Sequence, residues 1–277
     1  MNSAILVLTD LSDTAEQAAQ YAAALGAPMR AGLVLLHLYP DPVTDPELAT
    51  MTLAQAIRDR AEITASLQEV IQRLPVPAEV EVASGTALDS VEKAVRHYHP
   101  LLLAVGLNTE DTWLDRWLSN HLLPVLSATH RPLLLVPADA PPARAPRRVL
   151  VAVDADAFTL NAATRALAPL LGAWSAAYSV VHVTARDDDH GLQSQLALSH
   201  VRASGLLPAT VPLELYESPL TEPATGVLET LADTRADLLV LIARPRSFLG
   251  QLFHRSVTAQ ILRRCRMPVL LLPVEAS

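Results

Sequence analysis

The chain has 277 residues, of which 51% are hydrophobic and 18% charged, and its formal net charge is −8. This length predicts two domains, and the negative charge disfavours binding to DNA or RNA, whose phosphate backbones attract basic surfaces. Cys265 is the single cysteine and no apolar run reaches the roughly 18 residues of a membrane helix, so we expect a cytoplasmic protein without an internal disulfide, a signal peptide or a membrane segment.

Short apolar runs alternate with amphipathic stretches along the first half. The runs predict strands, and the stretches have the 3.6-residue periodicity of helices. We expect strands over residues 4–9, 32–39, 79–84, 101–105 and 133–136, and helices over 13–25, 46–73, 87–98 and 119–129. The second half repeats the alternation, with strands near 148–153, 177–183, 211–216, 238–242 and 269–272, and helices near 158–171, 190–204, 221–234 and 256–265.

The two halves also match in sequence. An apolar run ends in aspartate at residues 5–10 and again at 149–154, and Pro132 and Pro268 each precede a closing apolar run that ends in proline. A repeat of this length indicates a duplicated domain rather than a solenoid unit. We expect the chain to divide into a first domain over residues 1–138, a proline-rich, semi-extended linker over 139–147, and a second domain over 148–277.

The predicted elements indicate an α/β fold. Strands that are apolar throughout are buried on both faces, which is typical of a parallel sheet between two helix layers. Alternating strands and helices build an open, doubly wound domain. We therefore expect two tandem, doubly wound, open parallel-sheet domains.

Several nucleotide and catalytic motifs are absent from the sequence. Lys93 is the one lysine and lies in a helical pattern, so there is no P-loop, and the nine glycines form no Gly-x-Gly-x-x-Gly fingerprint. There is neither a Gly-x-Ser-x-Gly elbow nor a His-Glu-x-x-His motif. No nucleophile–base pair, carboxylate pair or metal cluster stands out, and these absences disfavour an enzyme.

In the order of its motifs the chain resembles the universal stress proteins in their tandem form. The resemblance covers nearly the whole chain. It rests on a first strand ending in aspartate, a fourth strand followed by an irregular loop, a serine opening the next helix, and a closing strand between prolines; residues 264–273 look particularly like the family's ending. The resemblance implies, in each half, an adenine nucleotide alpha-hydrolase-like fold with strand order 3-2-1-4-5.

The implied strand order places a crevice in each half. Ligands of open α/β sheets bind outside the carboxyl ends of the strands, where the winding direction reverses. That reversal lies between the first and fourth strands, where Asp10 and Asp154 end their strands and the loops 106–119 and 242–256 begin. The family's ATP site lies at the same place. Each aspartate is a candidate to bind a ligand's ribose or base, and the alternative is that it caps the following turn.

The family's ATP motif is broken in both halves. ATP-binding members carry Gly-x-x-Gly, nine residues, and then Gly-Ser/Thr, so that backbone N–H groups approach the phosphates. In the second half the three glycine positions fall on Ile242, Pro245 and Arg255, and Pro245 has no N–H. In the first half Gly106 fits the first position only with a one-residue deletion, and Leu118 replaces the last glycine. Binding of ATP or AMP is therefore disfavoured.

Charge distinguishes the two loops. Acidic residues of the first loop, Glu110, Asp111 and Asp115, repel a triphosphate. The second loop has no acid and precedes a helix N-terminus, so we expect any bound anion there, at the candidate residues Arg244, Arg246, Arg255 and Ser256. The alternatives are a solvated arginine loop, and helix N-caps for Ser256 and its first-half counterpart Ser119.

Three further groups have plain structural interpretations. His37 and His182 occupy matching strands, and we interpret both as packed or hydrogen-bonded sheet residues. The Asp-Asp-Asp-His run at residues 187–190 is interpreted as a solvated loop, since adjacent residues seldom converge on one metal ion. Trp113 and Trp117 are expected to pack on a neighbouring helix, with an exposed ligand or partner surface as the alternative.

We expect a stress-response binding or scaffold module without conventional catalysis, metal or certain cofactor. Its partner would be an unknown protein or a small ligand, not a nucleic acid or a membrane. One alternative is a nucleotide-binding protein with slow ATP hydrolysis in one half; another is a binder of a small apolar or anionic metabolite in the remodelled crevice. An apolar edge strand invites aggregation, so the two halves should pair through their fifth strands as a pseudo-dimer, with a higher oligomer still open.

Overall fold

The structure is a computed structural model that describes residues 3–39, 53–107, 128–184, 190–218, 221–244 and 256–275. Within these residues the first half contains β1 (Ala4–Thr9), α1 (Asp13–Gly26), the 3-10 turn η1 (Ala27–Met29), β2 (Gly32–Tyr39), α2 (Leu53–Arg73), β3 (Ala78–Ser84), α3 (Ala87–Tyr98), β4 (Leu102–Leu107) and β5 (Leu133–Pro137). The second half contains β6 (Arg148–Ala152), α6 (Ala162–Arg165), α7 (Ala168–Ala173), β7 (Ala177–Val181), α8 (His190–Ser204), β8 (Leu213–Tyr216), α9 (Pro223–Asp233), β9 (Leu238–Ala243), α11 (Val257–Arg264) and β10 (Val269–Pro273).

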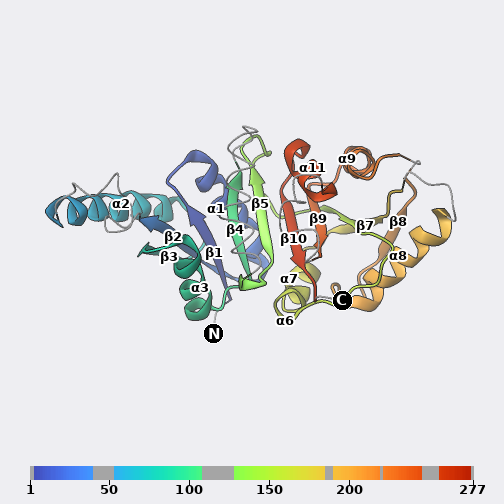
Figure 1. Cartoon of the computed structure of the whole chain (residues 1–277), viewed down its shortest axis with the longest axis horizontal. Helices are drawn as coiled ribbons and strands as arrows, with labels where there is room; N and C mark the ends of the chain where they lie inside the picture. Colours follow the sequence, from blue (N-terminus) through green and yellow to red (C-terminus); the bar gives the residue numbers. More distant parts are fainter. Residues whose placement is uncertain are drawn as a thin grey trace.

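All the described strands belong to one continuous sheet with the order β3-β2-β1-β4-β5-β10-β9-β6-β7-β8 (Figure 1). Read from its own first strand, each half has the order 3-2-1-4-5, and every strand pair within a half is parallel. The predicted α/β class of two tandem doubly wound parallel sheets is therefore confirmed.

The two half-sheets meet at their fifth strands. β5 and β10 pair antiparallel, with Val269 opposite Leu135 and Leu271 opposite Leu133. Both strands are buried along their whole length. The apolar strand that would form a bare edge in either half alone thus finds its hydrogen-bond partner in the other half.

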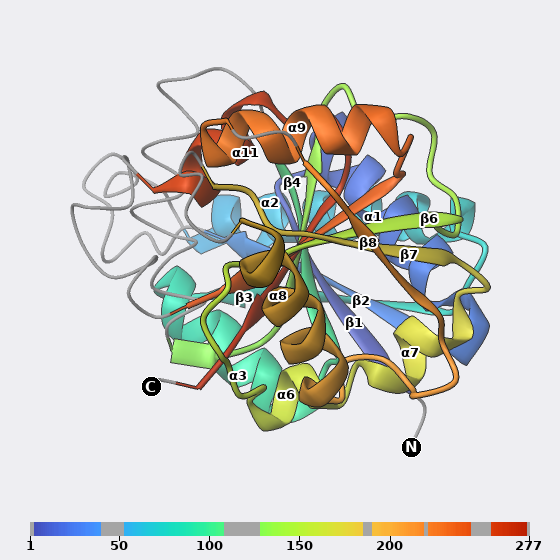
Figure 2. The same cartoon turned by 90° about the vertical axis from the view of Figure 1, so that its right-hand side faces the viewer.

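Two apolar layers cover the two faces of this sheet, and each layer runs through both halves. Alternate residues of a strand point to opposite faces, so Ile5 and Val7 belong to one layer and Leu6 to the other. The first layer packs against α1, α2, α7 and α8, and the second against α3, α9 and α11. Figure 2 looks along the sheet from the second half and shows the strands fanning out by their twist.

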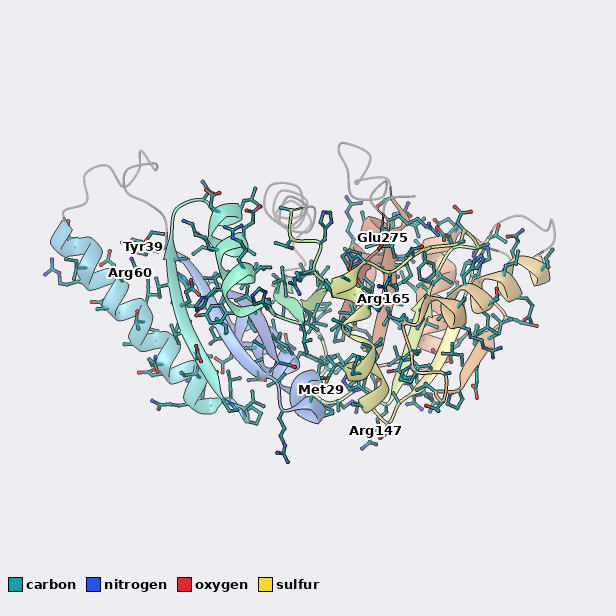
Figure 3. The ribbon with its side chains drawn as sticks, turned by 90° about the horizontal axis from the view of Figure 1, so that it is seen from below. Met29, Tyr39, Arg60, Arg147, Arg165 and Glu275 are labelled. Atoms are coloured by element: carbon teal, nitrogen blue, oxygen red, sulfur yellow. The ribbon has the colours of Figure 1, made fainter. Side chains whose placement is uncertain are left out.

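Buried polar contacts join the halves beside the strand pair. The indole Nε1 of Trp174, which is buried, donates a hydrogen bond to the Leu25 carbonyl at 2.9 Å. Residues between β5 and β6 are held on α1, because Gln17 Nε2 donates to the Ala140 carbonyl at 2.8 Å and the Tyr21 hydroxyl donates to the Pro141 carbonyl. Figure 3 shows side chains of both halves at the junction, seen from below. The halves therefore pack through side chains as well as through the sheet.

The helix predicted over residues 158–171 is wrong as a single element. The chain forms α6 and α7 instead, and Asn161 caps α6 by accepting a hydrogen bond from the Thr164 backbone N at 2.7 Å. Pro169 lies in the first turn of α7. Proline has no N–H to donate, and its ring clashes with the carbonyl four residues earlier, which here is that of Arg165, so one continuous helix is excluded.

Candidate functional site

The two predicted crevices are equivalent in strand register. Ile5 lies opposite Leu102 on β4, and Val149 lies opposite Leu238 on β9. Counting forward from these pairs, Asp10 and Asp154 occupy matching positions just after β1 and β6. By the same count, Gly106 on β4 matches Ile242 on β9. The register thus allows the two halves to be compared residue by residue.

Each crevice has a histidine beneath its aspartate. Nδ1 of His37 lies 2.9 Å from the Thr9 carbonyl, and Nδ1 of His182 lies 3.2 Å from the Val153 carbonyl. A carbonyl can only accept, so Nδ1 carries the proton in both rings. Burial lowers the pKa of His37, opposed by the smaller effects of the Thr9 carbonyl and Asp10. The predicted hydrogen bonds of both histidines are confirmed; His37 lies in β2, whereas His182 directly follows β7, which ends at Val181.

In the first crevice Asp10 is exposed and organises the turn into α1. Its Oδ1 accepts hydrogen bonds from the Ser12 backbone N, at 3.0 Å, and from the Ser12 hydroxyl. Ser12 in turn caps α1 by accepting from the Ala15 backbone N at 3.2 Å. Within the described residues Asp10 makes no ion pair. The turn-capping alternative is observed for this aspartate, and one of its carboxylate oxygens keeps no partner among the described residues.

Gly106 allows α1 to begin directly after this turn. A Cβ atom at Gly106 would lie 2.4 Å from the carbonyl oxygen of Thr14, in the first turn of α1, far inside van der Waals contact. Backbone atoms cannot yield as a flexible side chain does. Glycine at this position therefore has a packing role, whatever part it takes in ligand binding.

In the second crevice Ile242 stands where the first half has Gly106. A side chain here leaves no room for a helix on the path that α1 takes in the first half. Accordingly the chain after Asp154 is not helical until α6, whereas α1 begins at Asp13, close behind Asp10. Residues 155–161 form no helix, so carbonyl groups of this segment can accept hydrogen bonds from side chains.

Arg244, which lies directly after β9, binds Asp154 and two backbone carbonyls of this segment. Its Nε and Nη2 donate to the two carboxylate oxygens of Asp154, at 2.8 and 2.6 Å. Nη2 also donates to the Asp156 carbonyl at 2.6 Å, and Nη1 to the Ala157 carbonyl at 3.1 Å. The Arg244 side chain is 10% exposed and that of Asp154 50%. Both oxygens of the candidate ligand-binding aspartate are thus occupied by a side chain of the protein.

The remaining candidates divide between the described and the undescribed residues. Ser256 caps α11, with its hydroxyl accepting from the Ala259 backbone N at 3.1 Å, so the N-cap alternative is observed for it. Arg246, Arg255, Ser119 and the loop residues Trp113 and Trp117 lie outside the described residues, as do Asp187, Asp188 and Asp189. A joint anion site of Arg244, Arg246, Arg255 and Ser256 stays a prediction, and the ion pair with Asp154 counts against the part of Arg244.

Two hollows in the described part of the molecule lie away from both aspartates. A hollow of about 700 Å³ at the junction of the halves is lined in part by His130, Asn161 and Glu275. A groove of about 450 Å³ lies between α9, α11 and the start of β6. Neither includes Asp10 or Asp154 in its lining.

Other chemically active groups offer little in the described residues. Burial raises the pKa of the Cys265 thiol to about 11, which leaves it protonated and unreactive at neutral pH. No three His, Cys, Asp or Glu side chains among these residues lie close enough to share a metal ion. A search of the same residues finds no helix that meets the length and hydropathy needed to span a membrane.

Sequence reasoning predicted no partner of Arg244 within the protein, since it assigned Arg244 to an anion site and Asp154 to a ligand or a turn. Two of the observed partners have no sequence signal at all. They are backbone carbonyls of Asp156 and Ala157, and any residue type has a carbonyl, so no signal in the sequence identifies them. The missing glycine at Ile242 was visible in the sequence, but only as a lost phosphate contact. Its second effect, the displacement of the helix, depends on how close α1 lies to β4 in the first half.

Comparisons with known proteins identify the fold and the family. The crystal structure of a universal stress protein from Archaeoglobus fulgidus DSM 4304 is similar over 99% of both chains, with a TM-score of 0.73 and 19% sequence identity. A universal stress protein family member from Burkholderia pseudomallei matches 50% of this chain and 97% of its own (24% identity, TM-score 0.36). A universal stress protein in complex with cAMP matches 48% of this chain and 96% of its own (18% identity, TM-score 0.38).

No protein with a curated description matches the chain. The profile of the universal stress protein family matches it twice, over residues 1–137 and 146–273, one match for each half. These matches cover nearly all of the sequence and follow the duplication seen in the sheet. The chain belongs to the universal stress protein family, in a tandem form.

Proposed function

We propose that this protein is a non-catalytic binding or scaffold module of the stress response, built as a cytoplasmic pseudo-dimer of domains at 1–138 and 148–277 joined by the linker 139–147. Its nucleotide site is degenerate in the second half. The observation that carries the proposal is the bidentate ion pair between Arg244 and Asp154.

Free energy favours the Arg244–Asp154 ion pair over a ligand that binds Asp154. A ligand that uses Asp154 must first separate this carboxylate from a guanidinium that is 10% exposed. Breaking a buried ion pair costs about 3–5 kcal/mol, and the half-exposed position of Asp154 lowers that figure. A ligand would have to exceed this cost before it gained any net affinity. The intramolecular partner therefore outcompetes a nucleotide ribose at this position.

The first crevice supports the alternative of ligand binding in one half. Asp10 has no ion-pair partner in the described residues, and Gly106 has no side chain where the second half has Ile242. If the protein binds AMP, ATP or another small metabolite, this crevice is the better candidate on the present geometry. The acidic residues predicted to follow it, Glu110, Asp111 and Asp115, favour a ligand without a triphosphate.

Titration calorimetry of the full chain with Mg-ATP tests the proposal. We expect no binding in the low micromolar range, which would require about −7 to −8 kcal/mol of binding free energy. Micromolar binding that survives Asp10→Asn and is lost in Asp154→Asn would contradict the proposal. Native mass spectrometry of freshly purified protein tests the metabolite alternative, because a bound compound appears as added mass.

A further inference from the structure

An arginine-rich groove lies in the second half, at the opposite end of the strands from the crevices. It is formed where β6, β9 and β10 begin and where α9 and α11 end, whereas the crevices lie where strands end. Its volume is about 450 Å³. Five arginines line it: Arg144, Arg148, Arg235, Arg264 and Arg266.

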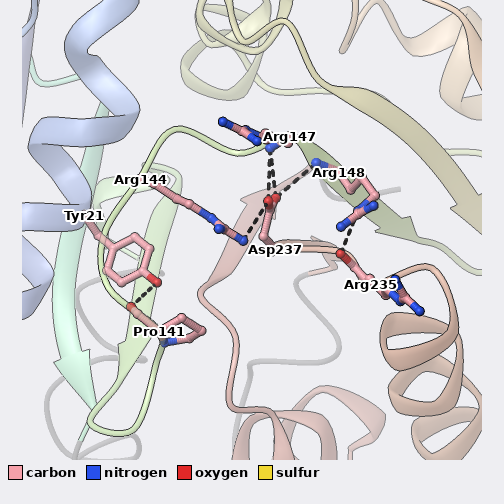
Figure 4. Close-up of polar contacts among 7 residues, drawn as sticks. All are labelled: Tyr21, Pro141, Arg144, Arg147, Arg148, Arg235 and Asp237. Atoms are coloured by element: carbon pink, nitrogen blue, oxygen red, sulfur yellow. Dashed lines mark hydrogen bonds and ion pairs between the residues drawn. The ribbon is translucent and has the colours of Figure 1, made fainter.

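The one acid of the groove is already satisfied. Asp237 accepts hydrogen bonds from the backbone N of Arg147 at 3.0 Å and of Arg148 at 3.1 Å, and an ion pair from Arg144 at 3.5 Å (Figure 4). Its side chain is only 10% exposed. The carboxylate thus holds the linker and β6 in place, and of the five arginines it forms an ion pair with Arg144 alone.

The arginines are spread around the groove rather than aimed at one point. Arg148 donates to the Arg235 carbonyl, Arg264 to the Thr225 hydroxyl, and Arg266 pairs with Asp139. No two of these guanidinium groups share an acceptor. The Arg235 guanidinium has no partner among the described residues. Such a distribution suits several separated negative charges better than one compact anion.

The backbone around the groove also disfavours a lone phosphate. The helices that end here, α9 and α11, present carbonyl groups and the negative end of the helix dipole, the reverse of a phosphate-binding helix N-terminus. Between the arginines lies an apolar floor that includes Leu228, Leu231 and Met267. Because helix C-termini repel carboxylates too, a matching ligand places separated carboxylates on the arginine side chains and an apolar side chain on the floor.

The corresponding surface of the first half differs at three register positions. By strand register Arg148 corresponds to Ala4 and Asp237 to Leu101. Arg235 corresponds to His99, and both residues adopt the left-handed conformation after a helix (φ 49° and 45°). The backbone is thus duplicated, while Arg148 and Arg235 have no arginine at the corresponding positions of the first half.

We propose that this groove docks an acidic peptide segment of a partner protein, with carboxylates on the arginine rim and one apolar side chain on the floor. The chain as a whole carries a net charge of −8, so acidic segments are repelled from most of its surface and guided to this groove. The inference goes beyond the proposed function, since it involves neither crevice, and it holds whether or not a nucleotide binds.

Fluorescence anisotropy with the full-length chain and a labelled Glu-Asp-Glu-Leu-Glu-Asp-Glu peptide tests the proposal. We expect saturable binding that weakens at high salt, and at least about tenfold weaker binding of the Gln-Asn-Gln-Leu-Gln-Asn-Gln peptide. The double variant Arg235→Asn, Arg264→Gln should bind the acidic peptide about tenfold more weakly, since each exposed charge pair contributes modestly. Asparagine is chosen because it tolerates the left-handed conformation.

The matched control is the double variant His99→Asn, Arg96→Gln, which changes the corresponding surface of the first half and should bind like wild type. Thermal unfolding of both variants shows whether the arginines only stabilise the helix ends. Equal binding by wild type and the Arg235, Arg264 variant would overturn the proposal. So would absence of acidic-peptide binding, or full displacement of the peptide by equimolar inorganic phosphate, which would indicate a small-anion site.

Discussion

The two halves of this protein share a backbone plan and differ in how the crevice beside the first strand is filled. In the first half a glycine on β4 lets α1 lie close to the sheet, and Asp10 turns back to hold Ser12. In the second half Ile242 takes the glycine position, the helix is delayed and broken, and Arg244 fills the space by binding Asp154. The difference teaches that the side chain at one strand position goes together with the pairing of the neighbouring aspartate. Both oxygens of Asp154 are bound, whereas one oxygen of Asp10 has no partner among the described residues.

The largest effect is expected from making the first half copy the second at β4. Gly106→Ile forces a side chain against the Thr14 backbone, and overpacking of this kind costs about 3 kcal/mol or more. Chemical denaturation should show a marked loss of unfolding free energy. Ile242→Val, the control in the second half, should cost about 1 kcal/mol. Similar losses in the two variants would show that the glycine has no special packing role.

Removing the Arg244–Asp154 ion pair of the second crevice should have the next largest effect. Arg244→Ala removes the partner of Asp154 and of two backbone carbonyls, and we expect a loss of about 2–3 kcal/mol, less than for a fully buried pair because Asp154 is half exposed. Asp10→Asn in the first crevice should lower the free energy of unfolding by less than about 1 kcal/mol. A double-mutant cycle with Asp154→Asn measures the coupling energy between Arg244 and Asp154. A coupling energy near zero would contradict a stabilising ion pair.

A smaller difference is expected between Asn161 and its register counterpart Gln17. Asn161 caps α6 and also donates to the His130 carbonyl of the first half, whereas Gln17 makes one hydrogen bond to the Ala140 carbonyl. Asn161→Ala should therefore cost about 1–2 kcal/mol and Gln17→Ala about 0.5–1 kcal/mol. The order of the two denaturation midpoints checks this expectation, and a reversed order would refute it.

The smallest effect concerns pH. Because burial lowers the pKa of His37, the folded protein binds a proton there less readily than the unfolded chain. The contribution of His37 to the free energy of unfolding is fully present above its ordinary pKa near 6.5. This contribution decreases as the pH falls from there through the folded-state pKa. Stability measured at several pH values should lose this slope in His37→Gln. An unchanged slope would mean that other groups cause the pH dependence.

The sequence alone determined the repeat, the alternation of strands and helices, the α/β class and the family resemblance. These depend on periodicity and on the order of motifs, which local residue patterns encode. It also predicted the hydrogen bonds of the histidines, since His37 and His182 have the same register to the accepting carbonyl, although His182 follows β7 and does not lie in it. The broken helix was missed although Pro169 was visible, because the amphipathic pattern continues across it.

Only the tertiary structure decided which groups meet. The pairing of Arg244 with Asp154 joins residues far apart in the chain, and its other acceptors are carbonyls that no residue type reveals. The clash at Gly106 depends on the height of α1 above the sheet, and the groove collects arginines from the linker, β6, α11 and two loops. Local patterns determine the elements, whereas contacts between distant elements depend on how these pack, and for this reason the sites could not be read from the sequence.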